Sequence, residues 1–496
     1  MDLRWHPYRY YPYERELALR EIRALLSTDD VTNTKHGVRV DGNFDATLAE
    51  RLAYFADASN GEQFVPTMQA RLERVNGNGL NRQSTRYSVH GLHEYKGKFN
   101  PQIARAILNI LEVPIGARVF DPFCGSGTSL VECSHLGMKA VGTDINPLAV
   151  FIANAKLVTL QLPAQRLCDA LKVTIQHLTS HTTKKPNAVD ERSQYLLSWF
   201  DPAILDQIEE LRFAIEQGDI ECAPPLLTIA SNLLRDYSLQ DPHDLRIRRR
   251  KSPLPEVPFN EAFKEAASRF LSRLEDAQAT LGRRSQLGKA LLFDSRSIKL
   301  GSCELGKAKF DCALTSPPYA TALPYIDTQR LSLVWLGLLP PSELPRLEAS
   351  LVGSREVRGQ SKTALLIALL ENRQNLPKNQ ADYCRMLQTS LSSKDGFRRQ
   401  AVPLLLYRYF SGMAEAFKSV RGCMNDGAPF ALIVGGNHTV LSGNRFDIDT
   451  PRHLAEIAGC CGWTHEETVP LQTYQRYGYH MSNAVSSEGL VILRAS

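Results

Sequence analysis

A glycine-rich turn with the sequence DPFCGSGT occupies residues 121–128. The apolar residues before it predict a strand, and the residues after it predict a helix. At such a junction glycine permits a positive φ and removes the Cβ that would collide with a ligand, as at Gly125 and Gly127. Asp144 ends the next predicted strand, where a carboxylate can accept both hydroxyl groups of a ribose. These residues predict a site for a ribose-bearing cofactor, although a GxG sequence by itself also occurs in tight turns without a ligand.

A second motif, TSPPY, occupies residues 315–319 after the predicted strand FDCAL. The exocyclic amino group of cytosine or adenine is a poor nucleophile, because its lone pair is delocalised into the ring. Acceptors such as Ser316 Oγ and the carbonyl of Pro317 can draw its hydrogens and direct the lone pair at a sulfonium methyl group. Successive prolines bring no N–H to compete, and Tyr319 can stack on a base swung out of a duplex. TSPPY therefore predicts methylation of an amino group, and the alternative is a strand end stiffened by proline.

These motifs need a scaffold that brings strand ends together. From about residue 100 the pattern runs helix, strand, glycine-rich turn, helix and strand, and strands resume at KALLFDS, FDCALTS and PFALIVGG. The alternation predicts an α/β fold with a doubly wound, Rossmann-like parallel sheet. WTHEETVPLQTY and EGLVILRA predict an antiparallel hairpin at the edge of that sheet. Ligands bind at the carboxyl ends of the strands in such sheets, where both motifs lie.

Four regions follow from these patterns. Residues 1–85 predict a helical N-terminal region, whose aromatic side chains either anchor the segment to a core or stack on bases. Residues 86–160 form the first half of the sheet, with the glycine-rich turn. Residues 161–287 predict a helical insertion broken by polar loops, and residues 288–496 complete the sheet. The last region contains a further helical stretch from about 325 to 425.

Composition narrows the class of protein. A chain of 496 residues with 43% hydrophobic and 22% charged residues can bury a sizeable core. The net charge of +5 is too small to imply a polyanionic partner without local clusters. The ten cysteines include no CxxC pair, so neither a metal site nor a disulfide framework is expected. The N-terminus lacks a signal-peptide core and no run of about 18 apolar residues occurs, so we expect a cytoplasmic protein without membrane insertion.

With both motifs, the sequence resembles the S-adenosylmethionine-dependent amino-methyltransferases of DNA, in particular the cytosine-N4 group, which carries S/T-S-P-P-Y. The resemblance covers roughly residues 86–160 and 288–496 and implies methyl transfer from S-adenosyl-L-methionine to N4 of cytosine. The catalytic motif that it implies consists of Thr315, Ser316, Pro317, Pro318 and Tyr319. The cofactor site that it implies consists of Lys98, Phe99, Pro101, Asp121, Pro122, Phe123, Gly125, Ser126, Gly127, Thr128, Asp144, Ile145 and Asp294. By the same resemblance, residues 93–101 would surround the methionine end of the cofactor, and Asp294 would meet its adenine amino group.

The order of the motifs leaves the target base open. Many cytosine-N4 enzymes place SPPY before the glycine-rich turn, whereas here it comes far after it. Several adenine-N6 enzymes have a recognition domain between the two motifs, where this chain has its predicted insertion. Adenine N6 is therefore the nearest rival target. Two further possibilities are a tRNA guanosine-N2 methyltransferase, which also pairs a glycine-rich turn with a proline-proline-aromatic motif, and a non-catalytic DNA-binding subunit.

The densest positive cluster of the chain, RIRRRK, lies at residues 246–251 within the predicted insertion. Neighbouring arginines can neutralise phosphates or donate to guanine edges, so we expect contact with double-stranded DNA, although solvated loops have the same composition. The residues expected there are Arg246, Arg248, Arg249, Arg250 and Lys251. Basic residues between about 340 and 400 form a second possible recognition element. We expect a site-specific enzyme of a restriction-modification or phage-defence system, with a nuclease as a further partner.

Overall fold

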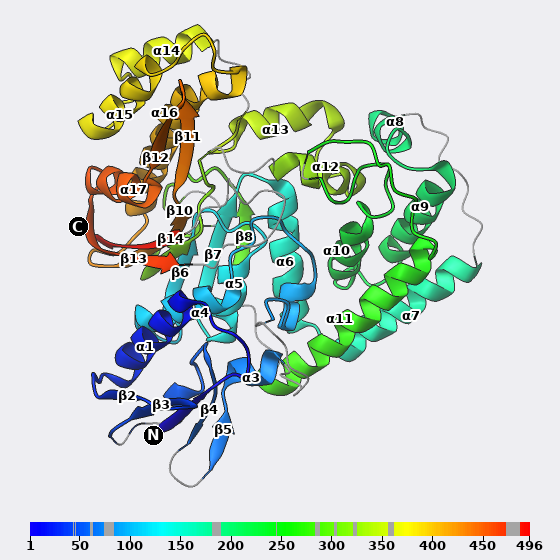
Figure 1. Cartoon of the computed structure of the whole chain (residues 1–496). Helices are drawn as coiled ribbons and strands as arrows, with labels where there is room; N and C mark the ends of the chain where they lie inside the picture. The colour runs from blue at the N-terminus through cyan, green and yellow to red at the C-terminus, as the bar shows by residue number, and fades with distance from the viewer. Residues whose placement is uncertain are drawn as a thin grey trace.

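A seven-stranded sheet forms the centre of the protein, with the strand order β13-β14-β10-β9-β6-β7-β8 (Figure 1). The computed structural model describes the chain except residues 43, 45, 60–62, 74–83, 181–189, 245, 283–287, 302–304, 321–324, 356–361 and 473–486. Five neighbouring strands are parallel: β8 (Gly288–Leu292), β7 (Lys139–Asp144), β6 (Arg118–Asp121), β9 (Cys312–Thr315) and β10 (Pro429–Gly435). Two separated stretches of chain thus build one sheet, as the sequence predicts.

The last two strands form the predicted antiparallel hairpin. β14 (Ser487–Ala495) runs antiparallel to β10 and pairs Glu488 with Gly435. β13 (Trp463–Gln472) then pairs antiparallel with β14 and forms the edge of the sheet. The hairpin places the end of the chain beside the parallel strands, so that Glu488 reaches the end of β10.

Apolar side chains project from both faces of this sheet, and helices cover each face. Along β9, Cys312 and Leu314 join a cluster with α4 (Pro101–Ile110), α5 (Thr128–His135) and α6 (Pro147–Gln161). Ala313, between them, joins a second cluster with α16 (Phe397–Arg421) and α17 (Thr450–Gly459). Side chains alternate across a strand, so a strand that is apolar throughout must be buried on both sides. The doubly wound α/β fold is confirmed.

The N-terminal region differs from the helical prediction, because it contains a five-stranded antiparallel sheet with the order β2-β3-β1-β4-β5. Its strands are β1 (Asp2–Trp5), β2 (Val31–Asn33), β3 (Gly37–Val40), β4 (Phe55–Ser59) and β5 (Phe64–Pro66), and its helices are α1 (Pro12–Leu26), α2 (Ala46–Ala49) and α3 (Met68–Glu73). These strands are too short to show a clear alternation. Leu3 of β1 pairs with Val38 on one side and Ala58 on the other, so contacts between remote segments form this sheet.

Trp5, Tyr8 and Tyr10 of this region serve its core. Trp5 stacks on Phe55 with 4.3 Å between ring centroids. Tyr8 and Tyr10 are buried, and the Tyr10 hydroxyl donates to the Tyr54 carbonyl at 2.6 Å. These side chains anchor the segment, which leaves them unavailable to stack on bases.

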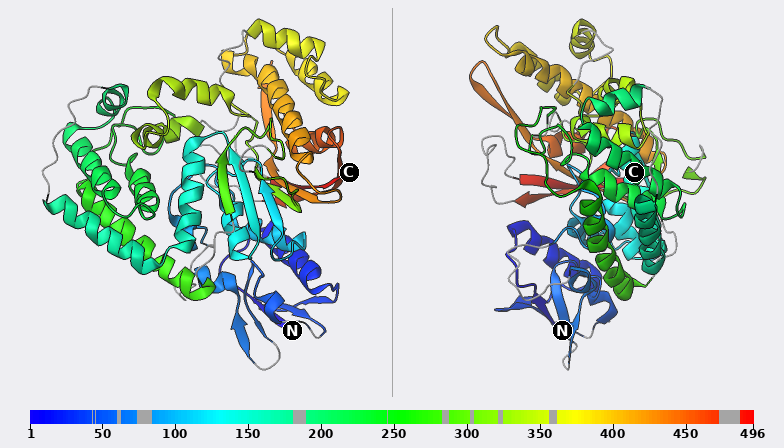
Figure 2. Two further views of the ribbon diagram at one scale, coloured as in Figure 1. Left: turned by 180° about the vertical axis from the view of Figure 1, so that it is seen from behind. Right: turned by 90° about the vertical axis from the view of Figure 1, so that its right-hand side faces the viewer.

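The insertion after α6 consists of helices and connecting loops, and it packs against α6 away from the hairpin (Figures 1 and 2). Its helices are α7 (Ala164–Ser180), α8 (Glu191–Leu197), α9 (Pro202–Glu216), α10 (Ala223–Leu233) and α11 (Phe259–Leu281). A second helical stretch, between β9 and β10, contains α12 (Tyr325–Trp335), α13 (Leu344–Ser350), α14 (Lys362–Glu371), α15 (Lys378–Thr389) and α16. The small hairpin of β11 (Asn437–Leu441) and β12 (Asn444–Ile448) follows β10.

Across the described ranges, no single helix is long and apolar enough to cross a membrane. The pair α6 and α7, bent by 117° at its break, meets the length and composition criterion only as a pair.

Candidate active site

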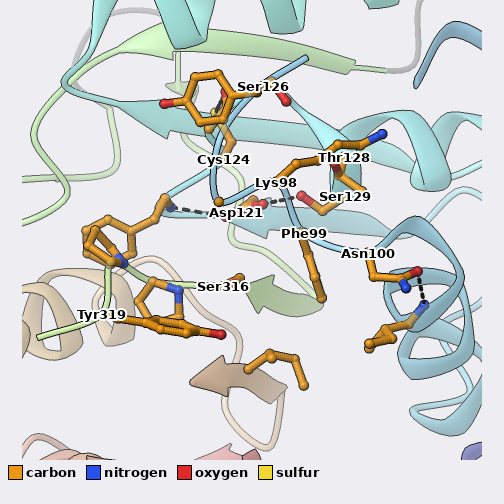
Figure 3. Close-up of a pocket in the computed structure, with 18 of the residues that line it drawn as sticks. Lys98, Phe99, Asn100, Asp121, Cys124, Ser126, Thr128, Ser129, Ser316 and Tyr319 are labelled. Carbon is orange, nitrogen blue, oxygen red and sulfur yellow. Dashed lines mark hydrogen bonds between the residues drawn. The ribbon is translucent and has the colours of Figure 1, made fainter. Parts of the chain in front are cut away.

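A cavity of about 530 Å³, here called the central pocket, opens at the carboxyl ends of β6, β7 and β9 (Figure 3). Both sequence motifs reach it. The predicted residues that line it are Lys98, Phe99, Asp121, Phe123, Gly125, Ser126, Thr128, Asp144, Ser316, Pro317, Pro318 and Tyr319. In Figure 3, Ser316 and Tyr319 lie on one side of Asp121, and Cys124 and Ser126 lie on the other. The structure therefore brings the glycine-rich turn and the TSPPY segment into one cavity.

Glycine is required at two positions of the turn for different reasons. Gly125 (φ +48°) and Gly127 (φ +78°) both have left-handed backbones. A Cβ on Gly127 would lie 2.8 Å from Cβ of Ala153 on α6, so this glycine allows the turn to pack on that helix. Gly127 is the residue before α5, and it does not line the pocket in the described chain. Gly125 does line it, and its N–H donates to Asp144 Oδ2 at 3.0 Å.

The Asp144 carboxylate, at the end of β7, accepts hydrogen bonds from the glycine-rich turn and from the loop that follows β7. Its second oxygen accepts the Asn146 N–H at 2.8 Å. Burial raises the pKa of Asp144 to about 6, although these hydrogen bonds oppose the shift. A half-buried carboxylate on the wall of the cavity is the group that the sequence predicts for a ribose.

Asp121, at the end of β6, connects the two motifs. Its carboxylate accepts the Thr315 hydroxyl at 2.6 Å, the Phe123 N–H at 3.0 Å and the Ser129 hydroxyl. Burial raises the pKa of Asp121 to about 6 as well. Thr315 is fully buried and does not line the described part of the pocket. The link between Thr315 and Asp121 sets the TSPPY segment at a defined position relative to the glycine-rich turn.

Some of the predicted cofactor residues lie elsewhere. Within the described chain, Pro101, Pro122, Ile145 and Asp294 do not line the pocket. Asp294, expected to meet an adenine amino group, pairs with Arg296 at 2.6 Å, and Arg296 also donates to the Ser350 carbonyl. This guanidinium holds the Asp294 carboxylate in contacts with its own loop, and the expected contact with an adenine amino group stays a prediction.

Lys98 lines the pocket, but its ammonium group is engaged with the backbone. Nζ donates to the carbonyls of Thr85 at 2.8 Å and His90 at 3.2 Å. Burial lowers the pKa of Lys98 to about 7. Lys98 therefore anchors the segment at 93–101 to the preceding loop and presents its stem to the cavity.

The structure adds pocket residues that were not predicted by name. Four of them, Tyr95, Gly97, Asn100 and Cys124, belong to the predicted segments at 93–101 and 121–128. The others are Tyr11, Tyr13, Ile103, Ser129, Asn146, Leu351, Val352, Ile433 and Glu488. Asn100 and Asn146 had a local signal, because each precedes a proline and caps a helix: Asn100 Oδ1 accepts the Gln102 N–H at 2.9 Å, and Asn146 Oδ1 accepts the Leu148 N–H at 3.0 Å. Tyr11 and Tyr13 belong to the aromatic N-terminal segment, for which the sequence left core anchoring and base stacking open. Glu488 had no signal, because it comes from a remote part of the chain.

A buried charged cluster lies behind the loop at 93–101. His90, Glu132 and His135 are close enough together to share a metal ion. Arg105, however, donates from Nε to Glu132 Oε2 at 2.7 Å and places its Nη2 3.2 Å from His135 Nδ1. A guanidinium inside the cluster already supplies the positive charge and opposes a second cation. We therefore interpret it as an ionic network that joins α4 and α5.

The basic run at 246–251 lies outside the pocket, on a loop that is tied to the protein. Arg246 and Arg248 are exposed and pair with Asp244 at 3.4 and 2.8 Å. Arg250 donates to the carbonyls of Asp236 and Pro253, and Lys251 is exposed. Of the predicted DNA contacts, Arg246, Arg248, Arg249 and Lys251 are exposed, whereas Arg250 is half-buried and serves the loop.

A stacking contact fixes this loop beside α12. The guanidinium groups of Arg249 and of Arg330 on α12 both lie over the Trp199 ring, 4.3 and 3.7 Å from its centroid. Because α12 is the first helix after the TSPPY segment, the basic loop is held next to the part of the chain that carries the motif.

The family model UPF0020, an RMKL-like methyltransferase domain, matches residues 92–195, which include the glycine-rich turn and Asp144. The chain carries a methyltransferase domain. The second motif, TSPPY, lies outside the matched residues, but its side chains line the same pocket.

Three relatives are similar to parts of this chain. Type II methyltransferase M.MjaII of Methanocaldococcus jannaschii is 46% identical over 69 residues, which are 14% of this chain and 13% of that protein. Type II methyltransferase M.AvaI of Nostoc sp. is 24% identical over 405 residues, 77% of this chain and 80% of that protein. A tRNA (guanine(10)-N2)-dimethyltransferase of Methanothermobacter thermautotrophicus is 42% identical over 52 residues, 10% of this chain and 16% of that protein. The chain thus spans a small part of two of these relatives and most of the third.

Proposed function

We propose that this protein is a DNA methyltransferase that transfers a methyl group from S-adenosyl-L-methionine to the exocyclic N4 amino group of cytosine. One observation carries the proposal: the glycine-rich turn, Asp144 and residues 316–319 line the same cavity. Its volume of about 530 Å³ lies in the range of small-molecule and cofactor sites. A cofactor and an acceptor amino group would meet there.

The residues around the turn fit the proposed cofactor. Asp144 accepts one backbone N–H at each oxygen, and a carboxylate offers about four lone-pair positions, so it can also accept ribose hydroxyl groups. The left-handed Gly125 brings the backbone to the cavity without a side chain. When bound, S-adenosyl-L-methionine supplies a methyl group activated by a sulfonium centre.

The TSPPY segment would hold the acceptor base. Ser316 Oγ and the Pro317 carbonyl would accept the hydrogens of the amino group, and the Tyr319 ring would stack on the base. S-adenosyl-L-methionine bound beside this segment would supply the methyl group, whose bond to sulfur would break as its bond to the amino nitrogen forms. The cationic amino group would release its proton to water, so no histidine base is needed.

The exposed part of the basic loop is the DNA contact that we propose. Arg246, Arg248 and Lys251 would meet phosphates, while the stacked Arg249 keeps the loop in place. The pairs with Asp244 are exposed and weak, so a phosphate can replace this carboxylate at little cost.

The relatives favour DNA over RNA as the substrate. Similarity to the Type II methyltransferase M.AvaI extends over 77% of this chain, whereas similarity to the tRNA (guanine(10)-N2)-dimethyltransferase is limited to 10%. Guanosine N2 in tRNA is the second candidate because of that shorter but more identical match. The resemblance of TSPPY to cytosine-N4 enzymes favours cytosine over adenine.

The decisive experiment supplies purified protein with labelled S-adenosyl-L-methionine and either duplex DNA or tRNA, followed by mass spectrometry of the digested nucleosides. We expect N4-methylcytosine in DNA. N6-methyladenine would correct the base, and N2-methylguanosine in tRNA would replace the proposal by the second candidate. Label in neither nucleic acid would contradict the proposed activity.

A further inference from the structure

Glu488, at the start of β14, accepts the Tyr319 hydroxyl with 2.7 Å between Oε1 and the phenolic oxygen. Both residues are partly buried and both line the central pocket. We propose that Glu488 is a positioning residue that holds the Tyr319 ring in the orientation in which it stacks on the target base. This inference rests on the proposed function, since the ring needs a base in the pocket on which to stack.

Two glycines enclose the same tyrosine. A Cβ on Gly435, which pairs with Glu488 in the sheet, would lie 3.1 Å from Cε2 of Tyr319. A Cβ on Gly353 would lie 2.7 Å from the carbonyl oxygen of Tyr319. The ring is therefore bounded by the end of β10, its hydroxyl by β14 and its backbone by the loop after α13. We call Glu488, Gly435 and Gly353 the Tyr319 clamp.

A clamped ring has a physical advantage over a mobile one. Stacking on a flipped-out base requires the ring to stop rotating, and that loss of freedom weakens binding unless the side chain is already fixed in the free protein. A hydrogen bond to a carboxylate is stronger than one between neutral groups, so Glu488 suits this purpose. The prolines before Tyr319 fix its backbone, but they do not set the angle of its ring.

The hypothesis makes a specific prediction about paired substitutions. Tyr319→Phe keeps the ring and removes the hydroxyl, and Glu488→Ala removes the acceptor. Each should lower kcat/KM for the nucleic acid by roughly tenfold, with the affinity for S-adenosyl-L-methionine unchanged. If Glu488 acts through Tyr319, the double variant should be no worse than either single variant. A further loss in the double variant, or full activity of Glu488→Ala, would overturn the proposal.

Three further variants separate positioning from general damage to the fold. Glu488→Gln still offers an oxygen to the hydroxyl and should recover most of the activity that Glu488→Ala loses. Gly435→Ala should lower activity without touching either hydrogen-bonding group, because its methyl group displaces the ring. Glu466→Ala, on the neighbouring strand and paired with Arg494, is the matched control and should behave as the wild-type protein. Equal losses in Glu466→Ala and Glu488→Ala would contradict a specific role.

A second readout does not depend on activity. With tyrosine labelled by ¹³C at Cζ, the Tyr319 resonance is assigned by its loss in Tyr319→Phe. It should shift in Glu488→Ala and return toward its original position in Glu488→Gln, even without nucleic acid. If this shift occurs but no nucleic acid is methylated, the proposed function fails and the clamp stands. If methylation occurs but the resonance does not move, the clamp fails.

Discussion

Asp121 and Asp144 illustrate how two similar carboxylates acquire different tasks. Burial raises the pKa of each to about 6. Asp121 directs its oxygens at Thr315, Ser129 and the Phe123 N–H, so it joins the two motifs. Asp144 holds only backbone N–H groups through the hydrogen bonds described above, and it keeps acceptor positions for a ligand. We therefore assign Asp121 to the framework and Asp144 to the proposed ribose contact.

The raised pKa of Asp144 predicts a pH dependence of cofactor binding. Above pH 6 the carboxylate is ionised and accepts hydroxyl groups well, whereas below pH 6 it is increasingly protonated. Affinity for S-adenosyl-L-methionine should therefore fall as pH is lowered from 7 to 5, by up to about tenfold per pH unit below the pKa. Calorimetric titration at several pH values measures this. Asp144→Asn should bind weakly and with a flatter pH profile, and an equally steep profile in that variant would assign the effect to another group.

At Tyr319 we expect catalysis and cofactor binding to separate. Tyr319→Ala removes a stacking surface that contributes about 1–3 kcal/mol per base, so kcat/KM should fall by roughly 10- to 100-fold. The dissociation constant for S-adenosyl-L-methionine should stay at the wild-type value. Asp144→Ala should do the reverse and weaken cofactor binding first. Loss of cofactor binding in Tyr319→Ala would mean that the ring contacts the cofactor instead of the base.

At the scale of elements, the basic loop shows how the insertion is attached to α12, in the helical stretch between β9 and β10. The guanidinium groups of Arg249 in the loop and Arg330 on α12 both stack on the ring of Trp199, which follows α8. Arg330 also donates to the Gln240 side chain at 3.2 Å, and the backbone of Gln240 forms an antiparallel β-bridge with Arg249. A loop held at several points presents its exposed arginines at defined positions, which reduces the entropy lost when they meet phosphates.

If the basic loop contacts DNA, substitutions in it should change how strongly DNA affinity depends on salt concentration. Each phosphate contact contributes about 0.9 to the slope of log affinity against log salt concentration. Changing Arg246 and Arg248 together to Ala should therefore lower the magnitude of that slope by about 2. Arg269→Ala on α11 removes another exposed arginine paired with a carboxylate and serves as the control. If the slope of the double variant matches that of the control, the loop is not part of the DNA interface.

At the scale of the whole molecule, the N-terminal region completes the pocket. Its helix α1 packs on α4, and Tyr11 and Tyr13 at the start of α1 line the central pocket. Arg20 of α1 also donates to Glu467 of β13 at 2.8 and 3.0 Å. A region that the family model does not match thus contributes to the cavity where the proposed chemistry occurs.

Glu21 makes the packing of α1 on α4 sensitive to pH. It is fully buried and accepts hydrogen bonds from Asn109 of α4 at 2.8 Å and from the Ala53 N–H at 3.1 Å. Burial raises its pKa from 4.5 to about 8. The Glu21 carboxyl group stays neutral in the folded protein up to about pH 8, whereas it ionises near pH 4.5 in the unfolded chain. The stability that it contributes is therefore complete below pH 4.5 and is lost as pH rises from 4.5 through 8.

Glu21→Gln should therefore become more stable relative to the wild-type protein as pH rises. The difference in the free energy of unfolding should grow between about pH 5 and 8 by at most about 1.4 kcal/mol per pH unit and then level off. Thermal unfolding at a series of pH values measures it. Glu16→Gln, on the exposed side of the same helix, is the control. A constant difference between Glu21→Gln and the wild-type protein would contradict the raised pKa.

The sequence was sufficient for features that depend on local pattern and on general rules of topology. Residues 121–128, Asp144 and residues 316–319 were predicted to share a site, because each stands at the end of a parallel strand and such ends meet at one edge of a sheet. The order of strands and helices likewise predicted the doubly wound sheet and its antiparallel hairpin. These features follow from short stretches of sequence, and a single stretch carries enough periodicity to identify its element.

The tertiary structure decided what depends on contacts between remote segments. The strands of the N-terminal sheet are stabilised by partners far along the chain, so their own residues predicted no sheet. Tyr11 and Tyr13 reach the pocket because α1 packs on α4, and Glu488 reaches it because β14 pairs with β10. Asp294 does not line the described pocket, and its carboxylate pairs with Arg296, which also donates to the Ser350 carbonyl. Side-chain direction depends on neighbours that no local pattern encodes, which is why the motifs were predictable and the residues that orient them were not.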